Sequence, residues 1–376
     1  MILQHIMNQS EIKIRYPQPS GLCYLNTASS GLVSKHSIEK SNDFNEKLSR
    51  LGSIQAEKFF AEEFPEIRRS ISQFVDAPLY EIALIPNFSF GLNAILPSIN
   101  QRRKVLLYQD DYPSLTLPFV LNGFDIYWIN SKDGFSIDLN EAEQLINKHE
   151  IEIVAISHVQ YLTGYKIDLE KLSALCQSHE TLLILDGTQS LGAIPFSFKS
   201  SGANIFITSN YKWMNGGYGT GIMCIDSDTL EHFPPRIGGF NSYKYIESSW
   251  EYLPSINSYE PGHPNMAGLA LLKDAIDFKN CIGINDIAVH NMTLVNYFIN
   301  RVSKLPYTLL GESEDTNRTS IIGIYGDKQL EEFLINNHVM VKMRNGIIRI
   351  GFHFYNTIQD IDRLIDVLSN YVKEQH

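Results

Sequence analysis

The fold is decided by two stretches of sequence, LLILDGTQS at residues 182–190 and IFITSNYKWMNGGYGTG at residues 205–221. Each opens with a continuous apolar run; the first run ends in Asp186, and the second leads to Lys212. A short apolar run bounded by turn residues is typical of a strand that is buried on both faces. We therefore expect two central strands, with a buried carboxylate at the end of one and an amine just beyond the other.

Short apolar runs of the same kind recur before and after these stretches. The full set is Val105–Tyr108, Asp125–Ile129, Ile151–Val159, Leu182–Asp186, Asn204–Ser209 and Gly221–Asp226. Between them lie segments with apolar residues at helical spacing, such as residues 64–74 and 168–177. Strands that alternate with helices predict an α/β fold with a mostly parallel central sheet.

The length of 376 residues predicts two domains of unequal size. The pattern changes after Pro254, where a segment rich in helix breakers precedes a helical stretch and then a tight-turn signal at Asn345-Gly346. We predict a large domain at residues 20–255 and a smaller α+β domain at residues 256–376. Residues 1–19 are expected to pack on the smaller domain.

Charge and composition exclude several classes of partner. The formal net charge of −11 leaves no basic stripe for nucleic acid or an anionic membrane. No run reaches the roughly 18 apolar residues of a membrane helix, and no signal-peptide core is visible, so we expect a cytoplasmic protein. The four cysteines show no CxxC pair and no zinc-ligand spacing, so we expect no metal site. They are Cys23, Cys176, Cys224 and Cys281.

Lys212 and Asp186 together suit an enzyme that holds pyridoxal phosphate. The aromatic neighbours Tyr211 and Trp213 would desolvate Lys212, which lowers its proton affinity and favours a Schiff base with an aldehyde. A buried carboxylate needs a partner, and the protonated ring nitrogen of this cofactor is one. The alternatives are an arginine or a helix N-terminus as the partner of Asp186, and an ordinary glycine-rich turn with a solvated lysine.

The segments DGTQSLGA at residues 186–193 and SNYKW at residues 209–213 resemble the class V aminotransferase family of fold-type I pyridoxal phosphate-dependent enzymes. The similarity extends from about Tyr24 to Tyr371. This family includes cysteine desulfurases, kynureninases and several transaminases. The resemblance implies a fold-type I transferase architecture, pyridoxal 5′-phosphate as cofactor, and a homodimer with its active site at the subunit interface.

The resemblance also implies roles for four residues of these motifs. Asp186 is expected to pair with the ring nitrogen of the cofactor, and Gln189 to donate a hydrogen bond to its phenolic oxygen. Ser209 is expected to bind the phosphate, and Lys212 to form the Schiff base. The family often has histidine just before this lysine. Here the residue is Tyr211, as in kynureninases, which leaves the phosphate contact of this position open.

Two further segments and one loop residue resemble cofactor contacts of the family. Residues 87–95 resemble its phosphate-binding turn, where Phe88 and Ser89 would contribute backbone N–H groups and a hydroxyl, although Ser89 also suits a simple helix cap. Tyr112 would stack on the pyridine ring, although a tyrosine before proline also suits simple packing. His263 stands where the family has a threonine that reaches the partner subunit's phosphate; a loop histidine without that role is the alternative.

Arg349 is the predicted anchor for the substrate. Strand alternation in IIRIGFHFY, residues 347–355, places Ile348 and Ile350 on one face and Arg349 on the other. A guanidinium binds a carboxylate through two parallel hydrogen bonds, and the segment resembles the family's pattern for gripping the substrate α-carboxylate. A structural salt bridge is the alternative. Ala28 lies in a segment that resembles the family's active-site entry strand and is expected to face the substrate.

The sequence specifies the cofactor more closely than it specifies the reaction. Desulfurases of this family present a nucleophilic cysteine shortly before the carboxylate-binding arginine, and this chain has no cysteine between Asp315 and Arg349. Persulfide-forming desulfuration is therefore disfavoured, and we predict an aminotransferase that acts on the α-amino group of an amino acid. One alternative is a β-lyase without a persulfide cysteine, similar to kynureninase or to a cysteine or selenocysteine lyase. Another is a cofactor-binding scaffold without turnover.

Overall fold

The computed structural model describes residues 9–246, 248–313 and 316–375. Its largest sheet has seven strands in the order β2-β8-β7-β6-β5-β3-β4. These are β2 (Ile82–Ile85), β3 (Lys104–Tyr108), β4 (Asp125–Ile129), β5 (Ile153–Ser157), β6 (Leu182–Asp186), β7 (Ile205–Ser209) and β8 (Gly221–Ile225). The strands from β7 to β4 are parallel to one another, and β8 is antiparallel to both β7 and β2. The predicted α/β fold with a mostly parallel sheet is confirmed.

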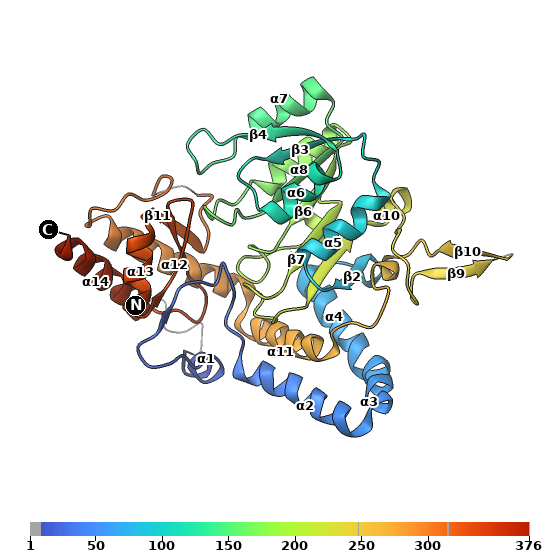
Figure 1. The fold of residues 1–376 in the computed structure, drawn as a ribbon, viewed down its shortest axis with the longest axis horizontal. Coiled ribbons are helices and arrows are strands. Elements are labelled where there is room, and N and C mark those ends of the chain that lie inside the picture. The colour runs from blue at the N-terminus through green and yellow to red at the C-terminus, as the bar shows by residue number, and fades with distance from the viewer. Residues whose placement is uncertain (1–8, 247, 314–315, 376) are drawn as a thin grey trace.

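Helices cover both faces of this sheet (Figure 1). The helices of the chain from its start to β8 are α1 (Gln9–Arg15), α2 (Lys35–Leu51), α3 (Ser53–Lys58), α4 (Phe64–Val75), α5 (Phe88–Ile95), α6 (Pro113–Leu121), α7 (Leu139–His149), α8 (Leu169–Ser178) and α9 (Phe198–Ser201). Those after β8 are α10 (Ser227–His232), α11 (Met266–Ile282), α12 (Ile284–Val302), α13 (Lys328–Asn336) and α14 (Ile358–Glu374). Residues of α4, α7, α8 and α11 pack on one face, and residues of α5 and α6 pack on the other.

The continuous apolar runs have a direct structural cause. Within β6, Leu183 and Leu185 belong to the core on one face of the sheet, whereas Ile184 belongs to the core on the other face. Successive side chains of a strand point to opposite faces, so both sets must be apolar when helices cover both. The polar residues Asp186 and Ser209 stand at the last positions of β6 and β7, where the strands reach one common edge.

The C-terminal part contains a second, antiparallel sheet. It has the order β11-β14-β13 and a core shared with α12, α13 and α14. Its strands are β11 (Ile321–Tyr325), β13 (Lys342–Arg344) and β14 (Ile347–Gly351). The tight turn predicted at Asn345-Gly346 joins β13 to β14, and both residues have positive φ, 50° and 75°. A capping box between Thr357 and Asp360 starts α14.

Two small pairs of strands complete the described chain. They are the parallel pair β1 (Cys23–Tyr24) with β12 (Val339–Met340), and the antiparallel pair β9 (Tyr243–Ile246) with β10 (Ser249–Tyr252), which projects from the body (Figure 1). No helix that the structure describes is both long enough and apolar enough to cross a membrane.

The predicted domain boundary stays a prediction. Helix α11 lies after it, yet α11 packs against α2 and α4 and contributes Leu269 and Leu272 to the core of the large sheet. Near the N-terminus, Tyr16 packs edge-on against Phe354, with 5.2 Å between ring centroids. Residues 1–8 of the segment 1–19 lie outside the described residues.

Candidate active site

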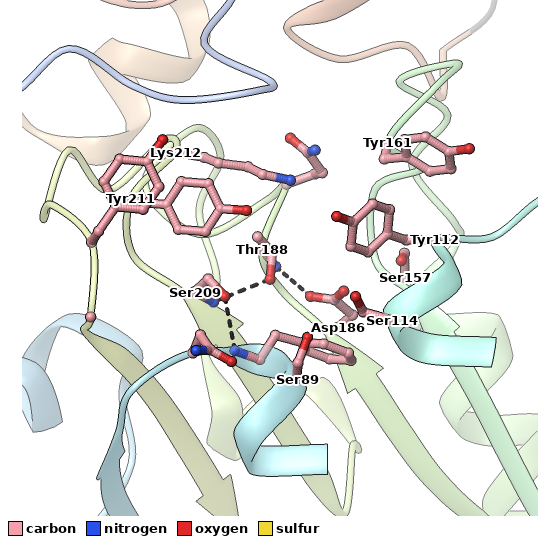
Figure 2. Close-up of a pocket in the computed structure, with 15 residues that line it drawn as sticks. Ser89, Tyr112, Ser114, Ser157, Tyr161, Asp186, Thr188, Ser209, Tyr211 and Lys212 are labelled. Carbon is pink, nitrogen blue, oxygen red and sulfur yellow. Dashed lines mark hydrogen bonds between the residues drawn. The ribbon is translucent and has the colours of Figure 1, made fainter. Parts of the chain in front are cut away.

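A pocket of about 390 Å³ opens at the edge of the large sheet where β5, β6 and β7 end and α5 begins. Figure 2 shows the side chains that converge on it. Its lining consists of Asn87, Phe88, Ser89, Tyr112, Ser114, Ser157, Tyr161, Asp186, Thr188, Gln189, Ser209, Tyr211, Lys212, Tyr218 and Gly219. Ligands of open α/β sheets bind at this edge, because loops that leave neighbouring strands in opposite directions open a crevice there.

Asp186 is the buried acid of the pocket. Its Oδ1 accepts a hydrogen bond of 2.8 Å from the backbone N–H of Thr188. Burial is the largest influence on this carboxyl group and raises its pKa to about 7, against the opposing hydrogen bonds from Thr188. No lysine or arginine in the described part of the chain forms an ion pair with it. A buried carboxylate without a cation is costly, so this position fits a positively charged ligand group.

Lys212 supplies the amine. It lies in the turn after β7 and is only 5 % exposed, and its Nζ lies 5.3 Å from the centroid of the Tyr112 ring and 5.7 Å from that of the Tyr211 ring. Burial, and after it the nearby Arg349 cation, lower the pKa of Lys212 to about 7, against the opposing influence of Asp186. Its Nζ has no hydrogen-bond partner among the residues described. The amine is therefore uncharged to a large extent at neutral pH and free to react.

The backbone around Lys212 is held closely. The Asn215 N–H donates to the Lys212 carbonyl at 3.1 Å, and the Gly31 N–H donates to the Tyr211 carbonyl at 2.8 Å. A Cβ atom at position 31 would lie 1.9 Å from the Lys212 carbonyl oxygen, so only glycine fits there. The direction of the lysine side chain thus depends on the position of its turn.

The start of α5 can accommodate a phosphate. The Phe88 N–H donates to Ser209 Oγ at 2.8 Å, and the Phe90 N–H donates to the Asn87 side chain at 2.9 Å. The Ser89 N–H belongs to the first turn, which has no intrahelical acceptor, and no protein group of the described chain accepts it. Free N–H groups and the positive end of the helix dipole bind anions. Phe88, Ser89 and Ser209 lie together in the lining of the pocket, and their role toward a phosphate stays a prediction.

Gln189 is oriented by two hydrogen bonds. Its Nε2 donates to the Ala28 carbonyl at 3.0 Å, and its Oε1 accepts from Trp213 Nε1 at 2.7 Å. One N–H of the amide remains for a ligand oxygen, which fits the predicted bond to the phenolic oxygen of the cofactor. Ala28 contributes only its carbonyl group to this contact and does not line the pocket.

Four tyrosine rings form the walls. Tyr112 meets Tyr161 edge-to-face, with centroids 5.2 Å apart, and Tyr211 stacks on Tyr218 at 4.7 Å. Figure 2 shows Tyr112 and Tyr161 on one side of the Lys212 amine and Tyr211 on the other. Burial raises the pKa of Tyr211 to about 12, so its hydroxyl keeps its proton at neutral pH. A planar ligand between these walls would meet aromatic surface and hydroxyl donors.

Arg349 and His263, both predicted as site residues, do not line the pocket. Arg349 lies beside it: Nη1 donates to the Tyr161 carbonyl at 2.9 Å and Nη2 to Ser29 Oγ at 2.5 Å, while its Nε is buried without a partner. His263 is in the loop before α11, with its ring centroid 5.7 Å from that of Phe60. Their roles toward substrate and partner subunit stay predictions.

Other pocket residues were not given individual roles from the sequence, although Asn87 lies in the segment that resembles the phosphate-binding turn. They are Asn87, Ser114, Ser157, Tyr161, Thr188, Tyr218 and Gly219. Ser157 is the last residue of β5 and is paired in register with Asp186. The sequence could have indicated Ser157, because the carboxyl ends of neighbouring parallel strands meet at one edge of the sheet. Thr188 lies two residues beyond Asp186, and its Oγ1 accepts from the Ser209 N–H at 3.1 Å.

Asp111 stabilises the turn that carries Tyr112, one of the aromatic walls of the pocket. Its carboxylate accepts hydrogen bonds from the Ser157 N–H at 2.8 Å, the Ser157 hydroxyl at 2.6 Å, Gln160 Nε2 at 3.1 Å and the Tyr112 N–H at 2.7 Å. These bonds tie the turn that carries Tyr112 to the end of β5. Only the fold brings these groups together, since Asp111 and Ser157 are 46 positions apart.

Comparison with known proteins places this site in context. The family model described as "Aminotransferase class-V" matches residues 23–364. A probable cysteine desulfurase of Pyrococcus abyssi is 22% identical over 96% of this chain and 97% of its own length. The apo structure of a cysteine desulfurase from Thermococcus onnurineus superposes with a TM-score of 0.89 at 20% identity, covering 97% of this chain and 98% of the other.

A third similar protein is C-DES, described as a cystine C-S lyase. Its complex with the reaction product cysteine persulfide has a TM-score of 0.84 at 18% identity, covering 94% of this chain and 98% of the other. Another C-DES structure carries glycine covalently linked to the PLP cofactor of that enzyme. These likenesses confirm the fold predicted from the sequence, and the family match confirms the resemblance and the predicted cofactor, pyridoxal 5′-phosphate.

The predicted aminotransferase reaction is wrong. The relatives and the similar structures are cysteine desulfurases and a C-S lyase, which cleave carbon–sulfur bonds. The expectation that desulfuration is disfavoured is contradicted by the same findings. The first error arose because the motifs around Asp186, Lys212 and Arg349 report the cofactor and the amino-acid backbone of the substrate, which transaminases and lyases share. The second rested on the lack of a cysteine between Asp315 and Arg349 as evidence against desulfuration.

Proposed function

Because the chain belongs to the aminotransferase class-V family, we propose that it is a pyridoxal phosphate-dependent enzyme that cleaves the carbon–sulfur bond of a cysteine-type amino acid. The observation that carries the proposal is the buried Lys212 amine, which faces the pocket, has no hydrogen-bond partner in the described part of the chain, and stands near the buried acid Asp186. Similarity to desulfurases along nearly the whole chain supports the choice of sulfur chemistry.

The cofactor, when bound, supplies an electron sink that labilises bonds at the substrate α-carbon and lets a β-substituent leave. The residues of this chain would bind the cofactor and move protons. Lys212 would hold the cofactor covalently and move a proton at its Nζ, for which a pKa of about 7 suits both donation and acceptance. Asp186 would hold a proton on the ring nitrogen. Ser89, Ser209 and the start of α5 would bind the phosphate.

Arg349 would bind the α-carboxylate of the substrate. Arg349 is 4 % exposed, and its guanidinium lies beside the pocket wall formed by Tyr161. The buried Nε has no acceptor among the described residues, so it can donate to a bound carboxylate. Ser29 Oγ is a neutral acceptor of Nη2, and a carboxylate in its place would form a stronger, charge-assisted hydrogen bond. Arg349 thus selects for an amino acid with a free carboxylate.

The cysteines of this chain lie away from the pocket lining. Cys23, Cys176 and Cys224 are buried, and Cys281 is exposed in the last turn of α11. Burial raises the pKa of each of the three buried thiols, which makes them poor nucleophiles. An assay of the proposed function therefore follows both sulfide in solution and sulfur bound to the protein.

The test compares substrates on the purified holoenzyme. L-cysteine and L-cystine are expected to yield sulfide or persulfide together with a sulfur-free three-carbon product, and Lys212→Ala should yield none. Kynurenine and L-alanine serve as substrates without sulfur. Release of alanine from kynurenine without any sulfur release from cysteine or cystine would replace the proposal with a carbon–carbon lyase.

We propose also that the active form is a homodimer, as the family resemblance implies. Light scattering of the purified protein should give twice the chain mass of 42.8 kDa. If His263 reaches the partner's phosphate site, His263→Ala should weaken cofactor retention in the dimer. A fully active monomer would contradict both statements.

A further inference from the structure

A second lysine is buried near the site, outside the pocket. Lys279 lies on α11, is 0 % exposed, and is one of the largest fully buried side chains among the described residues. Its Nζ donates to Asn215 Oδ1 at 2.8 Å and lies 4.4 Å from the centroid of the Phe354 ring. No carboxylate in the described chain forms an ion pair with it. Burial of an amine without an ion-pair partner is energetically unfavourable, and packing of the core alone does not explain why a lysine occupies this position.

The neighbours of Lys279 determine its protonation. His353 Nε2 lies 3.0 Å from the Trp213 carbonyl oxygen and 3.0 Å from Asn215 Oδ1. Both oxygens can only accept, so Nε2 must carry a hydrogen. Lys279 Nζ lies 3.3 Å from this same nitrogen. An ammonium would oppose that N–H group, whereas an uncharged amine can accept from it. Burial lowers the pKa of Lys279 well below its ordinary value, which agrees with the uncharged form.

These contacts hold the turn that carries the reactive lysine. His353 binds the carbonyl of Trp213, the residue after Lys212, and Lys279 binds the side chain of Asn215. Asn215 is fully buried, has a left-handed φ of 57°, and donates from Nδ2 to the Leu32 carbonyl at 2.8 Å. His353 stands four residues beyond Arg349 on the segment that follows β14. The network therefore joins the Lys212 turn to the segment that carries the carboxylate anchor.

We propose that Lys279 is a positioning residue that, through Asn215 and His353, sets the direction in which Lys212 enters the pocket. The proposal rests on the proposed function only in that Lys212 binds the cofactor. Because the Lys212 amine forms no hydrogen bond with any residue that the structure describes, its placement depends on the backbone of residues 212–215. Displacement of a reacting group by about 1 Å can cost up to about 10²-fold in rate.

The test measures how fast pyridoxal phosphate becomes attached to Lys212. Apoprotein is mixed with the cofactor, samples are reduced with borohydride at intervals, and the modified Lys212 peptide is quantified by mass spectrometry. Lys279→Met, which removes the donor, is expected to slow attachment about tenfold. Lys279→Gln keeps an uncharged donor and should stay within about twofold of the wild type. Lys273→Met, on the same helix but paired with Asp277, is the matched control.

Several outcomes would overturn the proposal. Attachment in Lys279→Met at the wild-type rate would do so, and so would a Lys279→Gln variant as slow as Lys279→Met. If circular dichroism shows that Lys279→Met does not fold, the same comparison is made between His353→Gln, which keeps an N–H for Trp213, and His353→Leu, which does not. Equal rates in that pair would also overturn it. Failure of the wild type to attach the cofactor at Lys212 would instead refute the proposed function.

Discussion

Lys212 and Lys279 are both lysines removed from water, yet the fold uses them differently. Lys212 faces the pocket, and its pKa responds to burial, to the Arg349 cation and to Asp186. Lys279 lies behind the same turn, has burial as the cause of its lowered pKa, and donates to Asn215. Desolvation lowers the pKa of both amines. What separates a reactive amine from a positioning amine is access to the pocket and the presence of a hydrogen-bond acceptor.

The largest effect is expected at Lys212. Lys212→Ala should abolish covalent attachment of the cofactor and reduce carbon–sulfur cleavage by about 10³-fold or more, because the nucleophile is gone. Turnover and the reduced cofactor–protein adduct are measured together. Lys199→Ala, an exposed lysine ahead of β7, is the control and should behave as wild type. Full turnover in Lys212→Ala would show that Lys212 is not the reactive lysine.

A second effect is expected from the acid that faces Lys212. Asp186→Asn should lower turnover by about 10²-fold, since a preorganised charge in the site is lost. Because the Asp186 charge raises the pKa of Lys212, the pH at which attachment is half-maximal should move downward in this variant. Asp110→Asn, an exposed acid next to Asp111, is the control. The assignment of Asp186 fails if its variant keeps turnover within twofold.

A third effect separates binding from chemistry. Arg349→Gln should raise KM for the amino acid about 10- to 100-fold with a smaller change in kcat, since a charge-assisted hydrogen bond contributes about 1.5–3 kcal/mol. Loss of this cation should also raise the pKa of Lys212, so the attachment rate should reach its half-maximum at higher pH than the value near 7 expected for the wild type. Arg344→Gln, exposed on β13, is the control. An unchanged KM would refute the anchor.

The smallest effect concerns stability. Lys279 has a lowered pKa when folded and its ordinary value when unfolded, so between these two values the unfolded chain binds more protons and stability rises with pH. Lys279→Met should flatten this rise by up to about 1.4 kcal/mol per pH unit. Urea unfolding of the apoprotein at pH 7 and pH 9.5 measures the difference. An equal slope in the variant and the wild type would mean that Lys279 keeps its charge.

Much of the site could be predicted from the sequence, for a physical reason. Asp186 and Ser209 end neighbouring parallel strands, so a sheet that is buried on both faces must bring them to one edge. Helix α5 begins beside them because β2 ends there and Asn87 caps the helix. Local pattern therefore predicted the cofactor, the phosphate end of the pocket and Lys212.

The reaction and the supporting network could not be predicted in this way. The reaction depends on how several loops shape the space beyond the cofactor, and the motifs in this sequence are common to transaminases and lyases. Asp111 meets Ser157 across 46 positions, and Lys279 meets Asn215 across 64. Nothing in the apolar pattern of α11 marks one lysine as buried.

By itself, the sequence predicted the α/β fold, because strand burial and strand ends are local properties of the chain. Its motifs around Asp186 and Lys212 predicted the class V resemblance and the cofactor, whereas the roles of single residues toward the cofactor stay predictions. Only the tertiary structure decided that Arg349 contacts the Tyr161 wall, that Tyr112 is held by Asp111, and that Lys279 stands behind Lys212. The Arg349 and Lys279 contacts depend on how the C-terminal segment and α11 approach the turns at the edge of the large sheet. The Asp111 contacts depend on the approach of the segments that follow β3 and β5, and no local pattern of residues encodes either arrangement.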